Sequence, residues 1–250
     1  MEQFLKQFNL NYSNRTNPLY LASCAIASDM INHVRLSQFL TPTEIKQINQ
    51  SKYQSKKHSL YLSRISAKFA ISPWNPDLSL SEIQISNGVF SQPFIQCSHI
   101  QNISISITHC KNIGVTVSYP EELLIGVDLE VSSKQIFKII SRQLTTQELT
   151  LFNAFSLSQE HLSTILWTAK EALSKALHIG FTSELRLFAI SSIRYVSNQY
   201  ICQFQHFPQF KAYSISFEGF ILTIVLPYHA KPNPSFSELV PIFSELTSKI

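Results

Sequence analysis

The sequence is organised around Ile125-Gly126-Val127-Asp128-Leu129-Glu130, a run in which apolar and acidic residues alternate. A period of two predicts a β-strand with Asp128 and Glu130 on one face and the apolar residues on the other. Two neighbouring carboxylates repel one another, which costs stability unless a cation neutralises them. The run therefore fits either a metal site or the solvated face of a strand end, and the strand alone does not choose between them.

A second motif, Trp167-Thr168-Ala169-Lys170-Glu171-Ala172, lies in a predicted helix over 159–178. At about 100° per residue the apolar residues form one broad stripe, and Trp167, Glu171 and Lys175 lie on the opposite side. The simplest interpretation is a solvated i,i+4 Glu–Lys pair, worth about 0.3–0.5 kcal/mol. A tryptophan on that side instead indicates a second buried surface, where Glu171 joins the two acids of the strand.

The remaining periodicity predicts an α+β fold. The expected strands are 19–27, 83–85, 102–109, 114–119, 125–130, 185–190, 200–204, 212–217 and 220–226, and the expected helices are 42–71 (perhaps broken), 134–142, 146–155 and 159–178. The two halves repeat a similar order and predict two similar α+β lobes in a pseudo-twofold arrangement. We expect an N-terminal lobe over 1–120, a C-terminal lobe over 121–230 and a tail over 231–250, which holds three prolines and could include a short terminal helix.

Composition excludes several classes of protein. The chain has 250 residues, 44% hydrophobic and 14% charged, which is typical of a folded globular protein. Its 5 glycines form neither of the common nucleotide-binding loops, and its 4 cysteines form no CxxC pair, so a zinc or redox site is not expected. Because we find no signal-peptide pattern and no apolar run long enough to cross a bilayer, we expect a cytoplasmic protein that does not bind membranes.

Two further features supply candidate residues. His109 ends the predicted strand 102–109, a place from which functional side chains project, although a histidine there is more often structural. In the stretch 57–69, which is also helical in pattern, a basic stripe runs at i, i+4, i+7 and i+11, formed by Lys57, Tyr61, Arg64 and Lys68. This stripe is an ordinary solvated face or, with an anionic ligand nearby, a phosphate-binding surface.

Together these motifs resemble the 4′-phosphopantetheinyl transferases, in particular their two-lobed type. Four blocks match in order: Leu62-Ser63-Arg64 with Lys68; Gln92-Pro93-Phe94 followed by Ser106–Cys110; Gly126-Val127-Asp128-Leu129-Glu130; and Trp167-x-x-Lys170-Glu171-Ala172 with Lys175. The last two blocks are the specific ones. The resemblance covers residues 60–180, roughly half of the chain.

The resemblance implies that coenzyme A binds between two similar lobes and that Asp128, Glu130 and Glu171 hold Mg²⁺ or Mn²⁺ against its pyrophosphate. It also implies a set of coenzyme contacts: Arg64, Lys68, Gln92, Thr108, His109, Lys170 and Lys175. The implied catalytic residues are Glu171, Lys175, Lys170 and His109, with Glu171 as the candidate to accept the proton. A serine of an apo acyl or peptidyl carrier protein attacks the β-phosphorus and releases adenosine 3′,5′-bisphosphate.

The chain also departs from the family pattern. It has Gln92 where the family has lysine, Thr108-His109-Cys110 in place of Ser-His-Ser, Ser106 for an asparagine and Ser63 for a glycine. These changes motivate an alternative hypothesis, a degenerate relative that binds carrier proteins without transferring anything. A third hypothesis, nucleic-acid binding by the acid-free segment 45–76, is not favoured because no RNA- or DNA-binding signature accompanies it. We expect a monomer, since two lobes in one chain can form the cleft.

Overall fold

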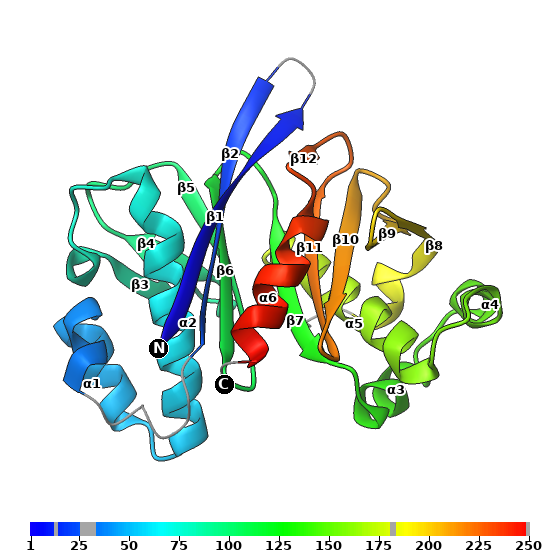
Figure 1. Ribbon diagram of the computed structural model, residues 1–250, viewed down its shortest axis with the longest axis horizontal. Helices are drawn as coiled ribbons and strands as arrows, with labels where there is room; N and C mark the ends of the chain where they lie inside the picture. Colours follow the sequence, from blue (N-terminus) through cyan, green and yellow to red (C-terminus); the bar gives the residue numbers. More distant parts are fainter. Residues whose placement is uncertain (13–14, 26–33, 181–183, 249–250) are drawn as a thin grey trace. The chain divides into compact units, whose positions relative to one another are not determined.

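The computed structural model of the chain describes residues 1–12, 15–25, 34–180 and 184–248, which divide into two compact units (Figure 1). Unit 1 is assigned residues 1–10, 16–123 and 245–250, and unit 2 is assigned residues 11–15 and 124–244. Each unit combines a sheet with helices, so the predicted α+β class is confirmed. Among the described helices, none combines the length and apolar character that crossing a bilayer would require.

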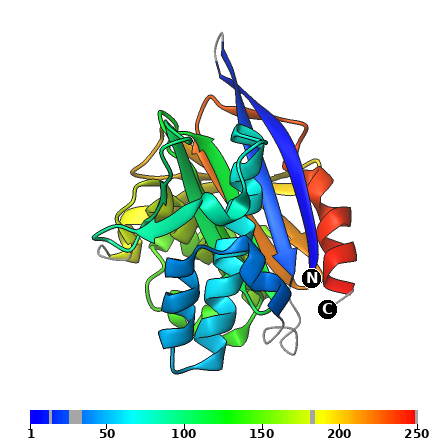
Figure 2. The ribbon, with the colours of Figure 1, turned by 90° about the vertical axis from the view of Figure 1, so that its left-hand side faces the viewer.

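Unit 1 is built on a sheet whose neighbouring strands are, in order, β1 (Glu2–Tyr12), β2 (Arg15–Ala25), β6 (Ile113–Pro120) and β5 (Ile103–Cys110). Helix α2 (Gln54–Ile71) packs on β6 and β5, and α1 (Pro42–Gln50) lies beside α2 (Figure 2). The small hairpin β3 (Gln84–Asn87) and β4 (Pro93–Gln96) and the 3-10 turns η2 (Val34–Phe39), η3 (Ser72–Trp74) and η4 (Leu80–Glu82) complete the unit. The apolar sides of the helices and sheet form its core.

The sequence predicted most of unit 1. The alternation over 102–109 and 114–119 is the antiparallel pair β5–β6, with Cys110 opposite Ile113 across the predicted turn. The long helix is broken into α1 and α2, as the sequence allowed. Strand β1 was not predicted, although Phe8, Leu10 and Tyr12 alternate with polar residues. Strand β2 starts at Arg15, earlier than expected, and its predicted end at 26–27 lies outside the described residues.

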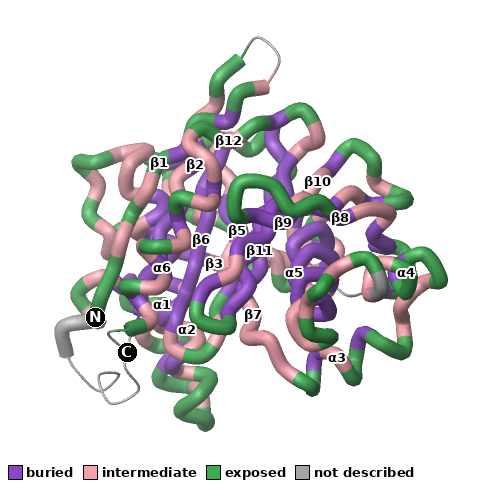
Figure 3. The backbone as a smooth tube through the Cα atoms, turned by 45° about the vertical axis from the view of Figure 1, so that its right-hand side comes forward, coloured by how far each residue is buried: buried purple, intermediate pink, exposed green. Residues whose placement is uncertain are grey.

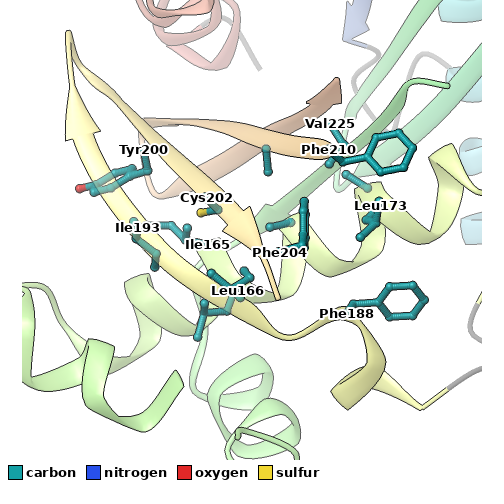
Figure 4. Packing of buried hydrophobic residues seen from close by; sticks show 14 of the residues in the cluster. Ile165, Leu166, Leu173, Phe188, Ile193, Tyr200, Cys202, Phe204, Phe210 and Val225 are labelled. Atoms are coloured by element: carbon teal, nitrogen blue, oxygen red, sulfur yellow. The ribbon is translucent and has the colours of Figure 1, made fainter. Parts of the chain in front are cut away.

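Unit 2 has the sheet order β7 (Gly126–Val131), β11 (Phe220–Pro227), β10 (Phe210–Phe217), β9 (Gln199–Phe204) and β8 (Ile190–Val196). Helix α5 (Gln159–Ala176) covers one face and is buried along most of its length (Figure 3). Its side chains Ile165 and Leu166 share one apolar cluster with Cys202 and Phe204 of β9 (Figure 4). Two shorter helices, α3 (Lys134–Ile140) and α4 (Thr146–Ala154), precede α5.

One expectation for unit 2 was wrong. The run 185–190 is the 3-10 turn η6 (Leu185–Phe188), and the strand β8 only begins at Ile190. The predicted tail contains the ordered elements β12 (Lys231–Asn233), η7 (Phe236–Glu238) and α6 (Leu239–Ser248). The ring of Phe243 stacks on Phe217 of β10 at 4.6 Å between ring centroids. These aromatic contacts cover part of the sheet face opposite α5 and give the C-terminal segment a packing role despite its prolines.

Both units contain the same buried anchor, built on a helix-capping glutamate. In unit 1, Thr41 caps α1 and Glu44 completes the capping box. The backbone N–H of Ile85 on β3 donates to Glu44 Oε1 at 3.0 Å, and Lys68 Nζ of α2 lies 2.8 Å from Glu44 Oε2. Glu44 thus ties one helix start to a strand and to the long helix of the unit.

Unit 2 repeats this anchor. Thr145 and Glu148 form the capping box of α4. The N–H of Ile190 on β8 donates to Glu148 Oε1 at 3.0 Å, and Lys170 Nζ of α5 lies 2.7 Å from the same oxygen. Since the same four kinds of contact group recur in the same places, the two units share one structural plan around this anchor.

Candidate active site

The candidate site of unit 2 begins with the close packing of β7 on α5 at Gly126. A Cβ atom at position 126 would lie 1.8 Å from the carbonyl oxygen of Ala172 and 2.8 Å from the backbone nitrogen of Ala176. Such distances are far inside van der Waals contact, so only glycine allows this approach. The glycine therefore brings the acidic strand against the helix that carries Glu171.

Asp128 lies on the face of β7 that is turned toward α5. It stands opposite Thr223 in the β7–β11 register, and Thr223 Oγ1 forms a 2.7 Å hydrogen bond with Thr168 Oγ1 of α5. Asp128 is only 2% exposed. Glu130, two residues further on the same strand, shares that face and is half-buried. The side-by-side acids predicted from the sequence thus project on the helix side of the sheet.

Lys175 of α5 contacts this acidic face directly. Its Nζ atom donates to Asp128 Oδ1 at 2.6 Å and to the carbonyl oxygen of Val127 at 3.1 Å. The lysine side chain is 28% exposed, whereas that of Asp128 is 3% exposed. The ammonium therefore neutralises a buried carboxylate and still reaches solvent. A cation that also contacts a ligand needs this access.

Glu171 lies one helical turn before Lys175 and interacts electrostatically with both acids of β7. Burial and the negative charge of Asp128 raise the pKa of Glu171 to about 8, with a further contribution from Glu130, while Lys175 acts in the opposite direction. A carboxyl group with such a pKa is largely protonated at neutral pH. The three predicted acids are therefore electrostatic neighbours with more negative charge than one lysine balances.

This donor set fits a divalent metal ion chemically. Mg²⁺ and Mn²⁺ take carboxylate oxygens, and a dication would offset the repulsion that raises the pKa of Glu171. Across the described ranges, however, no three His, Cys, Asp or Glu side chains already stand in an arrangement that could hold a metal ion. The Lys175–Asp128 contact is consistent with this, because an ammonium already occupies one acid oxygen. Binding an ion would require the acids to draw together.

Lys170 lies elsewhere than the sequence suggested. It was expected to contact phosphate, but it is fully buried and its Nζ atom pairs with Glu148. Burial lowers the pKa of Lys170, and the charge of Glu148 raises it in opposition. The lysine before Glu171 thus fixes α5 from the inside, while Glu171 and Lys175 remain on the side of β7.

Comparison with known proteins supports the assignment of this segment. Residues 124–225 match the 4′-phosphopantetheinyl transferase superfamily. The resemblance inferred from the motifs is thereby confirmed at the level of the superfamily, and transfer of phosphopantetheine is supported as its general chemistry. The matched residues include Asp128, Glu130, Glu171 and Lys175 and lie within unit 2. No curated protein matches the chain at a significant level.

The expected basic stripe of unit 1 is largely interior. Arg64 is 6% exposed, and its Nε atom lies 3.8 Å from Glu44 Oε1. Lys68 is fully buried, pairs with Glu44 and donates to the backbone oxygens of Leu80 and Ile83. These two residues therefore hold the anchor of unit 1, and the structure does not place them on a solvated surface where a transferase would meet its coenzyme.

His109 lies at a pocket of unit 1. The pocket has a volume of about 600 Å³ and is lined by Gln54, Ser55, His58, Ser59, His109, Cys110, Lys111 and Asn112. Thr108, the neighbouring residue on β5, is buried and points to the other face of the strand. Of the two adjacent residues predicted to contact coenzyme, only His109 lines this pocket.

His58 was missed by the sequence analysis and is the most unusual residue of the pocket. It is 7% exposed, and in the described part of the chain neither of its ring nitrogens makes a hydrogen bond. Burial lowers the pKa of His58. A buried imidazole with both nitrogens open is costly unless a ligand or water satisfies them. Its place beside the basic stripe was the one signal available in the sequence.

Gln92 is engaged in the turn between β3 and β4. Its Oε1 atom accepts a hydrogen bond from the N–H of Phe90 at 2.9 Å, and its backbone oxygen accepts one from Gly88 at 2.8 Å. The side chain stabilises the hairpin loop. Gln92, Thr108 and the buried cations are thus not brought together with His109 at the pocket.

Proposed function

We propose that the protein transfers the 4′-phosphopantetheine group of coenzyme A to a serine of an acyl or peptidyl carrier protein in a reaction that depends on Mg²⁺ or Mn²⁺. One observation carries this proposal. Within the segment that matches the superfamily, β7 packs on α5 at Gly126, so that Asp128 and Glu130 of the strand and Glu171 of the helix are electrostatic neighbours beside the cation Lys175. Such an excess of negative charge is useful where a dication and a pyrophosphate are to be bound.

The chain's own residues have simple tasks in this reaction. Phosphoryl transfer depends on positioning and charge neutralisation more than on covalent chemistry from the enzyme. Asp128, Glu130 and Glu171 would hold the metal ion, which supplies positive charge against the phosphate oxygens. Lys175, which reaches solvent beside Asp128, would neutralise further charge on the phosphates. No serine or cysteine nucleophile of this chain is needed, because the carrier serine supplies it.

Glu171 is the proposed general base. The serine oxygen forms a bond to the β-phosphorus, the bond from that phosphorus to the bridging oxygen breaks, and the leaving group is adenosine 3′,5′-bisphosphate. The serine proton passes to the carboxylate of Glu171. Asp128 positions Lys175 through their 2.6 Å contact.

The pocket of unit 1 is proposed to bind a phosphate of the coenzyme. His109 lines it, and Lys111 adds a cation. His58 offers two ring nitrogens that have no protein partner in the described ranges. These groups replace the contacts that had been expected from Arg64 and Lys68.

A carrier-loading experiment tests the function. Incubation with an apo carrier protein, coenzyme A and Mg²⁺ should add the mass of one phosphopantetheine group to the carrier, and chelation of the metal should abolish the change. Asp128→Ala and Glu171→Ala should lose loading and remain folded. Glu184→Ala, an exposed acid of the same unit, is the matched control and should retain it. Failure to modify a broad set of acyl and peptidyl carriers would overturn the proposal.

The engagement of Gln92 and the burial of Arg64 and Lys68 favour one alternative, a relative that binds carrier proteins without transfer. Calorimetry separates the two. Saturable binding of coenzyme A that requires Mg²⁺ supports the transferase, whereas carrier binding without any coenzyme binding supports the alternative.

A further inference from the structure

The unit 2 sheet has a polar, cationic region on the face opposite α5. Along β10, Ala212 packs into the core beneath α5, so Lys211 and Tyr213 point to the other face. The register places Gln203 of β9 beside Lys211 and Ser192 of β8 beside Gln203. The three side chains form one row across three strands.

A second row runs parallel to the first. Ile201 of β9 stands beside Tyr213, and Arg194 of β8 stands beside Ile201. Arg194 is exposed and Ile201 is half-buried. The aromatic packing of η7 and α6 covers the neighbouring part of this face, where the ring of Phe236 lies 5.8 Å from that of Tyr213. The cationic end of the face therefore stays open beside a covered, apolar end.

Lys211 is held in place by aromatic rings. Its Nζ atom lies 4.6 Å from the ring centroid of Tyr228 and 5.8 Å from that of Tyr213. Gln203 Nε2 donates to Tyr228 Oη at 3.4 Å, and Ser192 Oγ donates to Gln203 Oε1 at 3.0 Å. The ammonium is thus fixed over two rings by a connected set of side chains rather than extended freely into water.

Two more cations gather around Lys211. Burial of Lys211 lowers the pKa of its ammonium group, and the positive charges of Lys231 and Arg194 lower this pKa further. Within the described residues, none of these three cations forms an ion pair with a carboxylate. Like charges brought together without acids destabilise the fold slightly, and they create a positive potential that attracts an anionic partner.

We propose that this cationic sheet face, formed by Arg194, Lys211 and Lys231, is a docking surface for an acidic helix of a partner protein. Arg194 and Lys211 are two strand spacings apart across the sheet and one row apart along it, a separation of roughly 12 Å. Carboxylates two turns apart on a helix are separated by about 11 Å, so one acidic stripe can meet Arg194 and Lys211 together. Lys231, exposed at the start of β12, adds a third contact.

The arrangement favours a protein helix over a nucleic acid. Bases need open aromatic rings on which to stack. On this face Tyr213 is buried and Tyr228 is half-buried under the ammonium of Lys211. Since Asp128 faces α5 on the other side of the sheet, a helix docked here leaves the candidate active site uncovered. The inference does not depend on the transfer reaction.

Fluorescence anisotropy with a labelled peptide tests the inference. The probe is a peptide of about five helical turns with glutamates along one stripe and alanine and glutamine elsewhere. A second peptide has the same composition with the glutamates distributed around the helix, and a single-stranded DNA oligonucleotide serves as a different polyanion. All are titrated with the full chain at low salt.

Arg194→Gln combined with Lys231→Gln should weaken binding of the striped peptide about fivefold or more. Both side chains are exposed, so the fold should persist, as circular dichroism would verify. The matched control combines Lys134→Gln with Lys138→Gln, two exposed lysines of α3, and should weaken binding less than about twofold. Equal losses in both variants or equal binding of the two peptides would overturn the proposal. So would tighter DNA binding that depends on the same two cations, since it would make the face a nucleic-acid surface.

Discussion

Binding of Mg²⁺ should release a proton from Glu171 at neutral pH. Burial and the charges of Asp128 and Glu130 raise the pKa of this carboxyl group to about 8, against the pull of Lys175. With that pKa, about nine-tenths of the protein carries a protonated Glu171 at pH 7. A carboxylate that binds a metal must be ionised. We therefore expect about 0.9 proton released per ion bound at pH 7, and about 0.1 at pH 9.

The same linkage sets the pH dependence of metal affinity. Below the pKa of Glu171, each pH unit should weaken Mg²⁺ binding about tenfold, or ~1.4 kcal/mol, and above it the affinity should level off. Isothermal titration calorimetry at pH 7 in PIPES and in Tris measures the proton count, because the two buffers differ in ionisation enthalpy and bind Mg²⁺ weakly. Glu171→Gln is the control and should release almost none.

Two outcomes would refute this reasoning. An identical heat in both buffers at pH 7 would mean that Glu171 is already ionised or does not bind the ion. A metal affinity that stays constant between pH 6 and pH 8 would contradict the raised pKa itself. Either outcome would remove the acid cluster as the basis of the proposed function.

Three further predictions concern the same unit. Glu171→Gln should raise the metal-free melting temperature at pH 9 more than at pH 6. Because the folded-state pKa is raised, the stability that Glu171 contributes falls as pH rises from about 4.5 to about 8. Equal shifts of the melting temperature at both pH values in differential scanning calorimetry would contradict this. Lys175→Ala should slow carrier loading strongly and lower the urea midpoint only slightly, since the lysine side chain is 28% exposed. Unfolding of this variant under mild conditions would make the lysine structural. Glu148→Ala should cost about 3–5 kcal/mol in urea unfolding because it leaves Lys170 buried without its partner, and adding Lys170→Met should restore part of that loss.

Local periodicity was sufficient to predict the elements that carry the site. The alternation at 125–130 and the apolar stripe of 159–178 correspond to β7 and α5. The common face of Asp128 and Glu130 also follows from the strand alone. The sequence further placed Glu171 and Lys175 on one side of the helix, and the structure turns both toward β7.

The errors arose where a contact joins distant parts of the chain. Helical periodicity shows which side of a helix is apolar, but it does not show that a lysine at the border reaches a buried acid on another helix. Lys68 and Lys170 do so through Glu44 and Glu148. The segment 231–250 was expected to be a tail that could include a short helix; that helix is α6, and its Phe243 stacks on Phe217 of the sheet. The strand expected at 185–190 failed because an apolar run of that length also suits a 3-10 turn.

The repeated anchor occurs in both units, whereas the acidic residues of the candidate site lie in unit 2. In unit 1, Ala22 stands opposite Thr116, as Asp128 stands opposite Thr223 in unit 2, and Phe69 follows Lys68 as Glu171 follows Lys170. The framework thus occurs in both units, whereas the acids at these two positions occur in unit 2 alone. The anchor therefore stabilises a unit whether or not that unit carries the acidic site.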